Sequence, residues 1–212
     1  IVFVGNNVRA RALAASLPGK NVLFAFASSA GHRERGRVAS IDLKKITIGQ
    51  LPDAPSNERL IGQIFEGTKY KVAYEPNMED YLLCHAAFVL PAAFVCYKTD
   101  GDLKKLKGNT AYLSRMIDAN REVHRALKNA GHEILPKDDK DFEGEAYRKT
   151  CLRFFKLICA TSLGKICVSD HAMNAVDEIS ALNRDLKQFF NETGAEYQVW
   201  QELEKEAGGY LK

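Results

Sequence analysis

Three polar side chains at helical spacing are the residues of this sequence most suited to act together. His171, Asn174 and Glu178 stand at i, i+3 and i+7, so a single helix would carry them on one polar stripe beside its apolar stripe. An imidazole, an amide and a carboxylate at the border of a core face could project into a cleft and contact a polar ligand. A solvated helix face is the alternative, and the residues alone leave both open.

Asn6 is a second candidate, because it follows an apolar stretch, Ile1–Val4, that predicts a buried strand. Ligands of open α/β sheets bind just beyond the carboxyl ends of strands. Asn also tolerates the left-handed conformation of tight turns, so an ordinary turn residue is the other interpretation.

The cysteines predict thiols and no metal site. They are odd in number, lie in apolar surroundings and include no Cys-x-x-Cys pair: Cys84, Cys96, Cys151, Cys159 and Cys167. This pattern favours a reducing compartment, with the cytoplasm as the default location.

The net charge and the longest apolar run argue against several function classes. A net charge of +3, with Lys and Arg dispersed among nearly as many acids, does not favour nucleic acid as a partner. The longest apolar run, "HAAFVLPAAFVC", is about twelve residues long and contains a Pro, which indicates a core helix and no membrane span. The Lys-rich segment 97–108 is typical of a solvated loop.

The first third of the chain is rich in predicted strands. Residues 1–4, 21–29, 36–43, 44–51 and 69–76 carry β-branched or aromatic residues near period two. Helices are expected over 9–17 and between Ser56, as N-cap, and Gly67.

Beyond residue 76 the periodicity is helical. Helices are expected over about 78–98, 109–130 and 143–167, from Ser169 to Gly194, and over the stretch "YQVWQELEKEA". The fold class is therefore α/β followed by all-α, with domains at 1–76 and 77–212. The expected helical core consists of Phe88, Val89, Phe94, Met116, Ile117, Phe154, Leu157, Ile179, Leu182, Leu186 and Phe189.

Four stretches together resemble the ketopantoate reductase family, the NADPH-dependent 2-dehydropantoate 2-reductases. They are "FVGNN", "RVASIDLKKITIGQLPD", "NMEDYLLCHAAFVLPAAF" and "SDHAMNAVDEISALNRDLKQFFNETGAE". The resemblance spans nearly the whole chain. It implies the tail of a Rossmann-type dinucleotide-binding domain, followed by a helical substrate and dimerisation domain of the 6-phosphogluconate-dehydrogenase C-terminal type.

The resemblance also implies roles for site residues. Glu178 matches the family's catalytic Glu, and Asn6 matches the turn Asn that orients nicotinamide and substrate. Asp170, with Asn174 and Ser169 near it, is expected to bind substrate. The implied cofactor is NADPH, the implied substrate a small 2-oxo acid such as 2-dehydropantoate, and the implied pathway pantothenate biosynthesis. A homodimer is left open.

The sequence departs from the family pattern at its central position. The family's catalytic Lys, which polarises the ketone and protonates the alkoxide, falls at Leu83. The Asn one turn later falls at Ala87, and the substrate Ser falls at Ile166. His85 lies about 200° around the helix from Leu83 and does not take the place of the Lys.

No Gly-x-Gly-x-x-Gly phosphate turn occurs in these residues. We therefore expect a fragment, with on the order of 80–100 residues of a dinucleotide-binding domain before Ile1. Whether the chain is an enzyme stays open, because a diverged, non-catalytic relative that binds a small molecule or dimerises fits the loss of the Lys. An unrelated helical adaptor would leave the strands of the first third unexplained.

Overall fold

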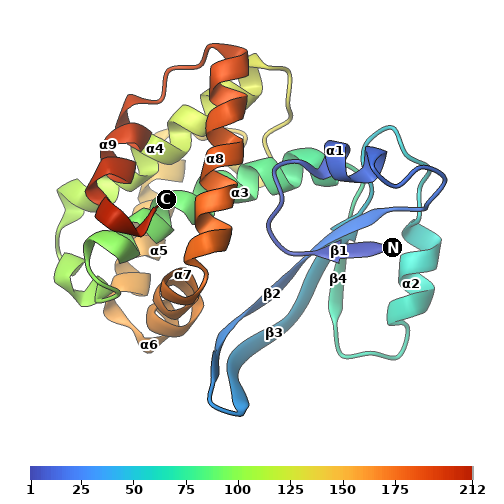
Figure 1. The fold of residues 1–212 in the computed structure, drawn as a ribbon, viewed down its shortest axis with the longest axis horizontal. Helices are drawn as coiled ribbons and strands as arrows, with labels where there is room; N and C mark the ends of the chain where they lie inside the picture. The colour runs from blue at the N-terminus through green and yellow to red at the C-terminus, as the bar shows by residue number, and fades with distance from the viewer. Residues whose placement is uncertain (212) are drawn as a thin grey trace.

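The computed structural model describes residues 1–211, and for residues 32–34 and 163 it describes the backbone alone. The chain forms a small mixed sheet with two flanking helices, followed by a bundle of helices (Figure 1). The elements of the sheet part are β1 (Val2–Val4), α1 (Ala10–Ala15), β2 (Leu23–Glu34), β3 (Arg37–Gly49), α2 (Glu58–Phe65) and β4 (Lys71–Glu75).

The helical part begins with α3 and contains short 3-10 and π-helical turns, labelled η, between its longer helices. Its elements are α3 (Met78–Lys98), η1 (Leu103–Leu106), α4 (Thr110–Asn129), η2 (Lys137–Asp139), α5 (Glu145–Ala160), α6 (Ser162–Gly164), η3 (Lys165–Ser169, a π-helical turn), α7 (Asp170–Asn174), α8 (Val176–Thr193), α9 (Gln198–Glu206) and η4 (Gly208–Tyr210).

The sheet has the order β1-β2-β3-β4, with β1 parallel to β2, β2 antiparallel to β3, and β3 parallel to β4. The expectation that Ile1–Val4 is a buried strand was wrong for the described chain. β1 lies at an edge of the described sheet, with Val2 45% and Val4 62% exposed. Only Phe3 points inward, and its ring stacks on Phe24 with 5.9 Å between the centroids.

The two strands expected over 36–43 and 44–51 are a single strand, β3, with a bulge between its halves. At the bulge Lys44 has a φ of 53°, and its backbone N–H and its ammonium group both donate to the Asp42 carboxylate. These contacts with Asp42 stabilise the irregular backbone conformation of Lys44. The strand therefore continues through a position where the sequence pattern predicts that one strand ends and the next begins.

Gly49 of β3 pairs with Glu75 of β4. A Cβ atom at Gly49 would lie 1.7 Å from the Glu75 carbonyl oxygen, so only glycine fits beside β4. Close packing of β3 against β4 therefore requires a glycine at position 49.

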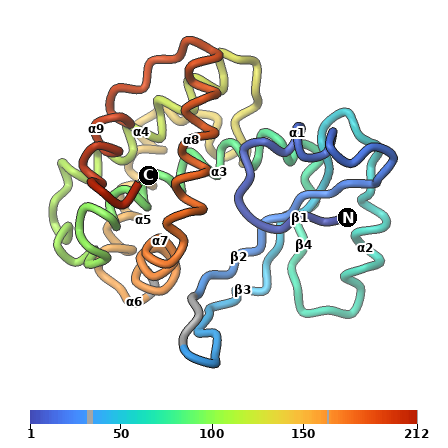
Figure 2. Tube along the Cα trace, in the orientation of Figure 1, coloured from blue at the N-terminus to red at the C-terminus, as the bar shows by residue number. Residues whose placement is uncertain are grey.

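Helices lie on both sides of the part of the sheet near β1 and β4, and the β2–β3 hairpin extends beyond them (Figure 2). Ile61 of α2 packs on one face with Ala25, Ile46 and Ile48. The other face, around Phe24, packs on α1 and the start of α3. Ser56 was expected to cap α2, but the N-cap is Asn57.

Helix α3 is central to the molecule. Met78 and Leu82 belong to the core under the sheet, whereas the helix from Leu83 onward belongs to the core of the helical part. By length and composition alone α3 could cross a membrane, but 78% of its apolar window is buried inside the protein, as in a core helix. The domain boundary between residues 76 and 77 stays a prediction, since α3 contributes both to the core under the sheet and to the core of the helical part.

Trp200 of α9 lies fully buried at the centre of the helical part, in edge contact with Phe94 and Phe190. Most of the expected core is buried or packed against the core. Phe154 and Leu157 are exceptions, at 41% and 53% exposure. The third predicted helix also ends earlier than residue 167, because α5 stops at Ala160 and the chain continues through α6 and η3.

Candidate functional site

The structure joins two of the expected site residues across the two parts of the chain. The Asn6 side-chain amide donates a hydrogen bond to Glu178 Oε1 at 3.0 Å, although 172 residues separate them in sequence. Asn6 lies two residues beyond the end of β1, and Glu178 lies in the first turn of α8. The Oδ1 atom of Asn6 is buried and has no hydrogen-bond partner in the protein.

Local structure fixes both residues. The Asn7 side chain accepts a hydrogen bond from the Arg9 backbone N–H at 2.7 Å, which holds the loop that carries Asn6. Asp177 and Glu178 are the acidic residues of the first turn of α8, where the free N–H groups of a helix favour negative charge. The pair therefore forms where the loop after β1 meets the start of α8 (Figure 1).

The expected polar stripe of His171, Asn174 and Glu178 was wrong, because no single helix carries it. The helix breaks at Ala175, which leaves His171 and Asn174 on α7 and Glu178 on α8. The Asn174 side chain donates instead to the Asp170 backbone carbonyl at 2.7 Å. Asn174 and Asp170 therefore contact each other, and no described hydrogen bond joins them to Asn6.

Ser169 is not near solvent. It is 2% exposed, and its hydroxyl donates to the backbone carbonyl of Gly101 in the turn after α3. This contact ties η3 to that turn, which is a structural role. Among the described residues, no group of three or more His, Cys, Asp or Glu side chains could hold a metal ion.

Leu83 faces the helical core and is 4% exposed. A lysine there would have to bury its ammonium group among apolar side chains, which is costly. His85, on the opposite face of α3, points toward the sheet: its ring lies 3.9 Å from that of Phe26 and stacks parallel to Tyr81 at 6.3 Å. Burial lowers the His85 pKa to about 4, so the ring is neutral at pH 7.

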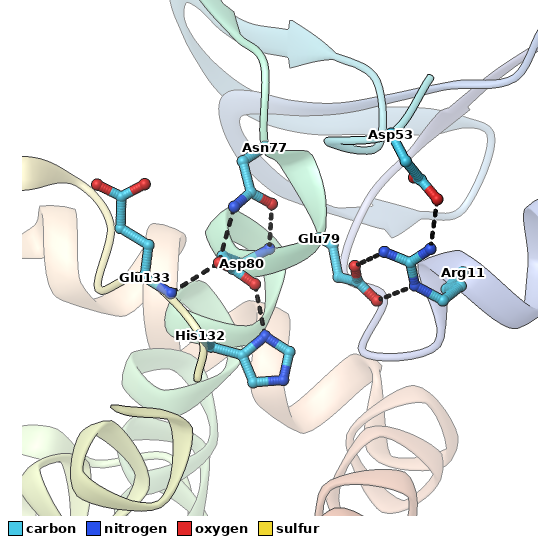
Figure 3. Close-up of polar contacts among 7 residues, drawn as sticks. All are labelled: Arg11, Asp53, Asn77, Glu79, Asp80, His132 and Glu133. Atoms are coloured by element: carbon cyan, nitrogen blue, oxygen red, sulfur yellow. Dashed lines mark hydrogen bonds and ion pairs between the residues drawn. The ribbon is translucent and has the colours of Figure 1, made fainter. Parts of the chain in front are cut away.

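A second polar cluster lies where α3 begins, and the sequence patterns did not single it out. Asp80 is 6% exposed and accepts three hydrogen bonds, from the Asn77 amide (2.7 Å), the Glu133 backbone N–H (2.7 Å) and His132 Nδ1 (2.6 Å) (Figure 3). Neighbouring Glu79 pairs outward with Arg11. An Asn-x-x-Asp spacing at a helix start was the available signal, since Asn77 also caps α3.

The pKa values in this cluster follow from these contacts. The hydrogen bond that His132 donates to the Asp80 carboxylate raises the pKa of His132 above its ordinary value. For Asp80, burial acts to raise the pKa, but the hydrogen bonds from His132, Glu133 and Asn77 outweigh it, so the pKa is lowered. The cluster therefore favours an ion pair inside the protein.

Comparisons with known proteins bear on the fold. No family model matches the chain, and no curated protein is significantly similar to it. Among solved structures, 2-dehydropantoate 2-reductase from Geobacter metallireducens GS-15 is similar at 14% identity and a TM-score of 0.73, covering 98% of this chain and 67% of that chain.

Two other solved structures are similar over much the same part of the chain. A dimeric ketopantoate reductase from Staphylococcus aureus matches at 11% identity and a TM-score of 0.67, covering 92% of this chain and 64% of that chain. D-mandelate dehydrogenase in complex with NADH matches at 10% identity and a TM-score of 0.71, covering 97% and 68%. The chain thus has the fold of about two thirds of these enzymes, and at these identities the likeness concerns the fold alone.

Proposed function

We propose that this chain is part of an NAD(P)-dependent oxidoreductase of the ketopantoate reductase type, which reduces a small 2-oxo acid such as 2-dehydropantoate in the cytoplasm. The observation that supports it best is the hydrogen bond between Asn6 and Glu178. Both residues were expected at the site from the family resemblance, and they meet across the two parts of the fold. The helical part would be of the 6-phosphogluconate-dehydrogenase C-terminal type.

The residues present fit a nicotinamide cofactor in one respect. Asn6 Oδ1 is a buried acceptor without a protein partner, at the carboxyl end of a strand, where a carboxamide N–H could donate to it. When bound, NADPH would supply a hydride for the carbonyl carbon of the substrate. The chain's own part is to hold that carbonyl in position.

In this mechanism Glu178 orients the substrate by accepting a hydrogen bond from the hydroxyl group of 2-dehydropantoate, which is carried two carbons away from the reacting carbonyl carbon. The Asn6 amide holds the carboxylate of Glu178 in place. Leu83 cannot donate a proton or stabilise an oxyanion. A general acid typically contributes about 10²–10⁴-fold to the rate, so we expect slow reduction.

A diverged relative without catalysis is the second candidate, and the burial of Leu83 favours it. Such a chain would retain the pair as a binding site, or serve dimerisation, as the similar dimeric enzyme from Staphylococcus aureus makes reasonable.

Binding of pantoate to the chain tests the proposed site directly. We expect pantoate to shift the side-chain amide NMR signals of Asn6 in a saturable way, and we expect Glu178→Gln to weaken binding by about tenfold, because a charged acceptor is lost. Asp177→Asn, one residue away on the same exposed turn, is the matched control and should leave binding unchanged.

Two results would count against the proposal. If pantoate leaves the Asn6 signals unmoved, the pair is not a substrate site. If Asp177→Asn weakens binding as much as Glu178→Gln, binding depends on the total negative charge at the start of α8 and not on a contact with Glu178.

A further inference from the structure

A partly open pocket with a volume of about 110 Å³ lies in the helical part. It is lined by α3, α4, the start of α5 and the segment 135–139, and its lining includes His85, Asn120, His124, Asp139 and Tyr147. Neither Asn6 nor Glu178 contributes to it.

Several polar atoms of this lining have no hydrogen-bond partner in the protein. They are Nδ2 of Asn120, Nε2 of His85 and both ring nitrogens of His124. The Cys84 carbonyl lies close enough to His124 to act on its pKa, but it lacks the geometry of a hydrogen bond. Asn120 is 4% and His124 1% exposed, so both are almost fully removed from solvent. Buried polar groups are nearly always hydrogen-bonded, and so many unpartnered ones around one cavity indicate that the cavity binds something polar.

The donors and acceptors around the cavity are mixed. Asn120 offers two N–H donors, since its oxygen already accepts from the Tyr147 hydroxyl at 2.5 Å. Burial lowers the pKa of His85 and of His124 to about 4, and the Cys84 carbonyl near His124 offsets only part of this effect. Each neutral ring presents one N–H donor and one lone pair.

The charge around the cavity disfavours an anion. Neutral imidazoles provide no positive charge, and the Asp139 carboxyl lies in the lining. Burial, with the neighbouring Asp138 charge, raises the pKa of Asp139 above its ordinary value. A metal ion is not favoured either, because no group of three possible ligands exists among the described residues.

We propose that this cavity is a binding site for a small uncharged primary amide. Its carbonyl oxygen would accept from the Asn120 amide, and its N–H groups would donate to the lone pairs of the His85 and His124 rings. A water in the liquid occupies about 30 Å³, so the cavity has room for a few waters or for one molecule of about four to seven non-hydrogen atoms. Ordered water is the competing occupant.

Acetamide and acetate, which share one shape but differ in charge, test the proposal. Each is titrated into the 212-residue chain while the ring signals of His85 and His124 are followed by NMR. We expect saturable shifts with acetamide, with a Kd in the millimolar range (roughly 1–50 mM for so small a ligand). We expect acetate to bind at least about tenfold more weakly, because its charge has no partner.

Three variants complete the experiment, each first checked for a dispersed, folded NMR spectrum. Asn120→Leu and His124→Phe should each weaken acetamide binding by about tenfold or more, and either variant suffices if the other does not fold. Ser180→Ala is the matched control, because its hydroxyl is also buried without a partner but lies on α8, outside this cavity. It should leave the Kd unchanged.

The proposal is overturned if the shifts grow linearly without saturation, since the cavity then holds water alone. It is equally overturned if acetate binds as well as acetamide, or if Ser180→Ala weakens binding as much as Asn120→Leu.

Discussion

Replacing Asp80 by Asn removes one charge from a buried cluster without changing the size of the side chain. The carboxylate is 6% exposed and accepts hydrogen bonds from Asn77, Glu133 and His132. In Asp80→Asn, one oxygen remains as an acceptor, but the new amide nitrogen faces N–H donors in place of the other. The variant therefore loses at least one charge-assisted hydrogen bond and leaves a buried donor unpaired.

The expected cost follows from these losses. A hydrogen bond to a charged group contributes about 1.5–3 kcal/mol, and breaking a buried ion pair costs about 3–5 kcal/mol. His132 is 24% exposed, which moderates the second figure. We expect Asp80→Asn to lower the free energy of unfolding by about 2–4 kcal/mol at pH 5.5.

The cost should depend on pH in a defined direction. The pKa of His132 is raised in the folded protein, so its contribution is fully present below the unfolded value of about 6.5 and is lost as the pH rises through the folded pKa. The pKa of Asp80 is lowered, so its contribution is present above about pH 3.9 and is lost as the pH falls through the folded pKa. Asp80→Asn should therefore cost more at pH 5.5 than at pH 8.5.

Urea unfolding of the wild type and the variant at these two pH values provides the measurement. Glu79→Gln is the control, because the Glu79–Arg11 pair is partly exposed and is expected to contribute no more than about 1 kcal/mol (Figure 3). The charge of Glu79 also raises the pKa of His132, but less than Asp80 does. A cost of Asp80→Asn below about 0.5 kcal/mol, or an equal cost at both pH values, would refute the assignment of His132 as the charged partner.

Three further predictions concern the sheet, the helical core and the cofactor. Gly49→Ala should destabilise the protein by about 3 kcal/mol or more in urea unfolding, since its Cβ would meet the Glu75 carbonyl oxygen, whereas Gly62→Ala, in the open middle of α2, should stabilise it by about 0.5–1 kcal/mol. A tolerated Gly49→Ala would mean that β3 and β4 lie farther apart. Leu182→Ala, at 5% exposure, should cost about 2–5 kcal/mol, and Leu157→Ala, at 53%, less than about 0.5 kcal/mol; similar costs would contradict the burial pattern. NADPH should not bind the 212-residue chain with micromolar affinity by calorimetry, because these residues contain no Gly-x-Gly-x-x-Gly turn to hold its pyrophosphate. Micromolar binding would show that other groups hold the phosphates.

Strong local signals predicted both ends of α3 and the end of α8. The apolar run of α3 was expected over 78–98 and spans those residues, and Gly194 ends α8 in the left-handed conformation, where glycine has no Cβ to clash. The break at Ala175 had no such signal. Neither Ala175 nor Val176 stops a helix by itself, so the interruption depends on tertiary packing.

The candidate site was predicted only in part, because its geometry is non-local. Asn6 and Glu178 were each expected from resemblance, but nothing in the sequence shows that they share a hydrogen bond. The family resemblance puts Leu83 at the catalytic position, whereas packing turns that side of α3 into the helical core and leaves His85 toward the sheet. Helical periodicity says which residues share a face but not which neighbour that face meets.

Helix α3 has a consequence for how the protein unfolds. Met78 and Leu82 complete the core beneath the sheet, and the next turns complete the core of the bundle. If the sheet melted alone, the first turns of α3 would expose apolar surface to water and fray, and that fraying would reach directly into the bundle. The two cores are therefore thermodynamically coupled through the continuous helix α3. Unfolding of either core lowers the stability of the other.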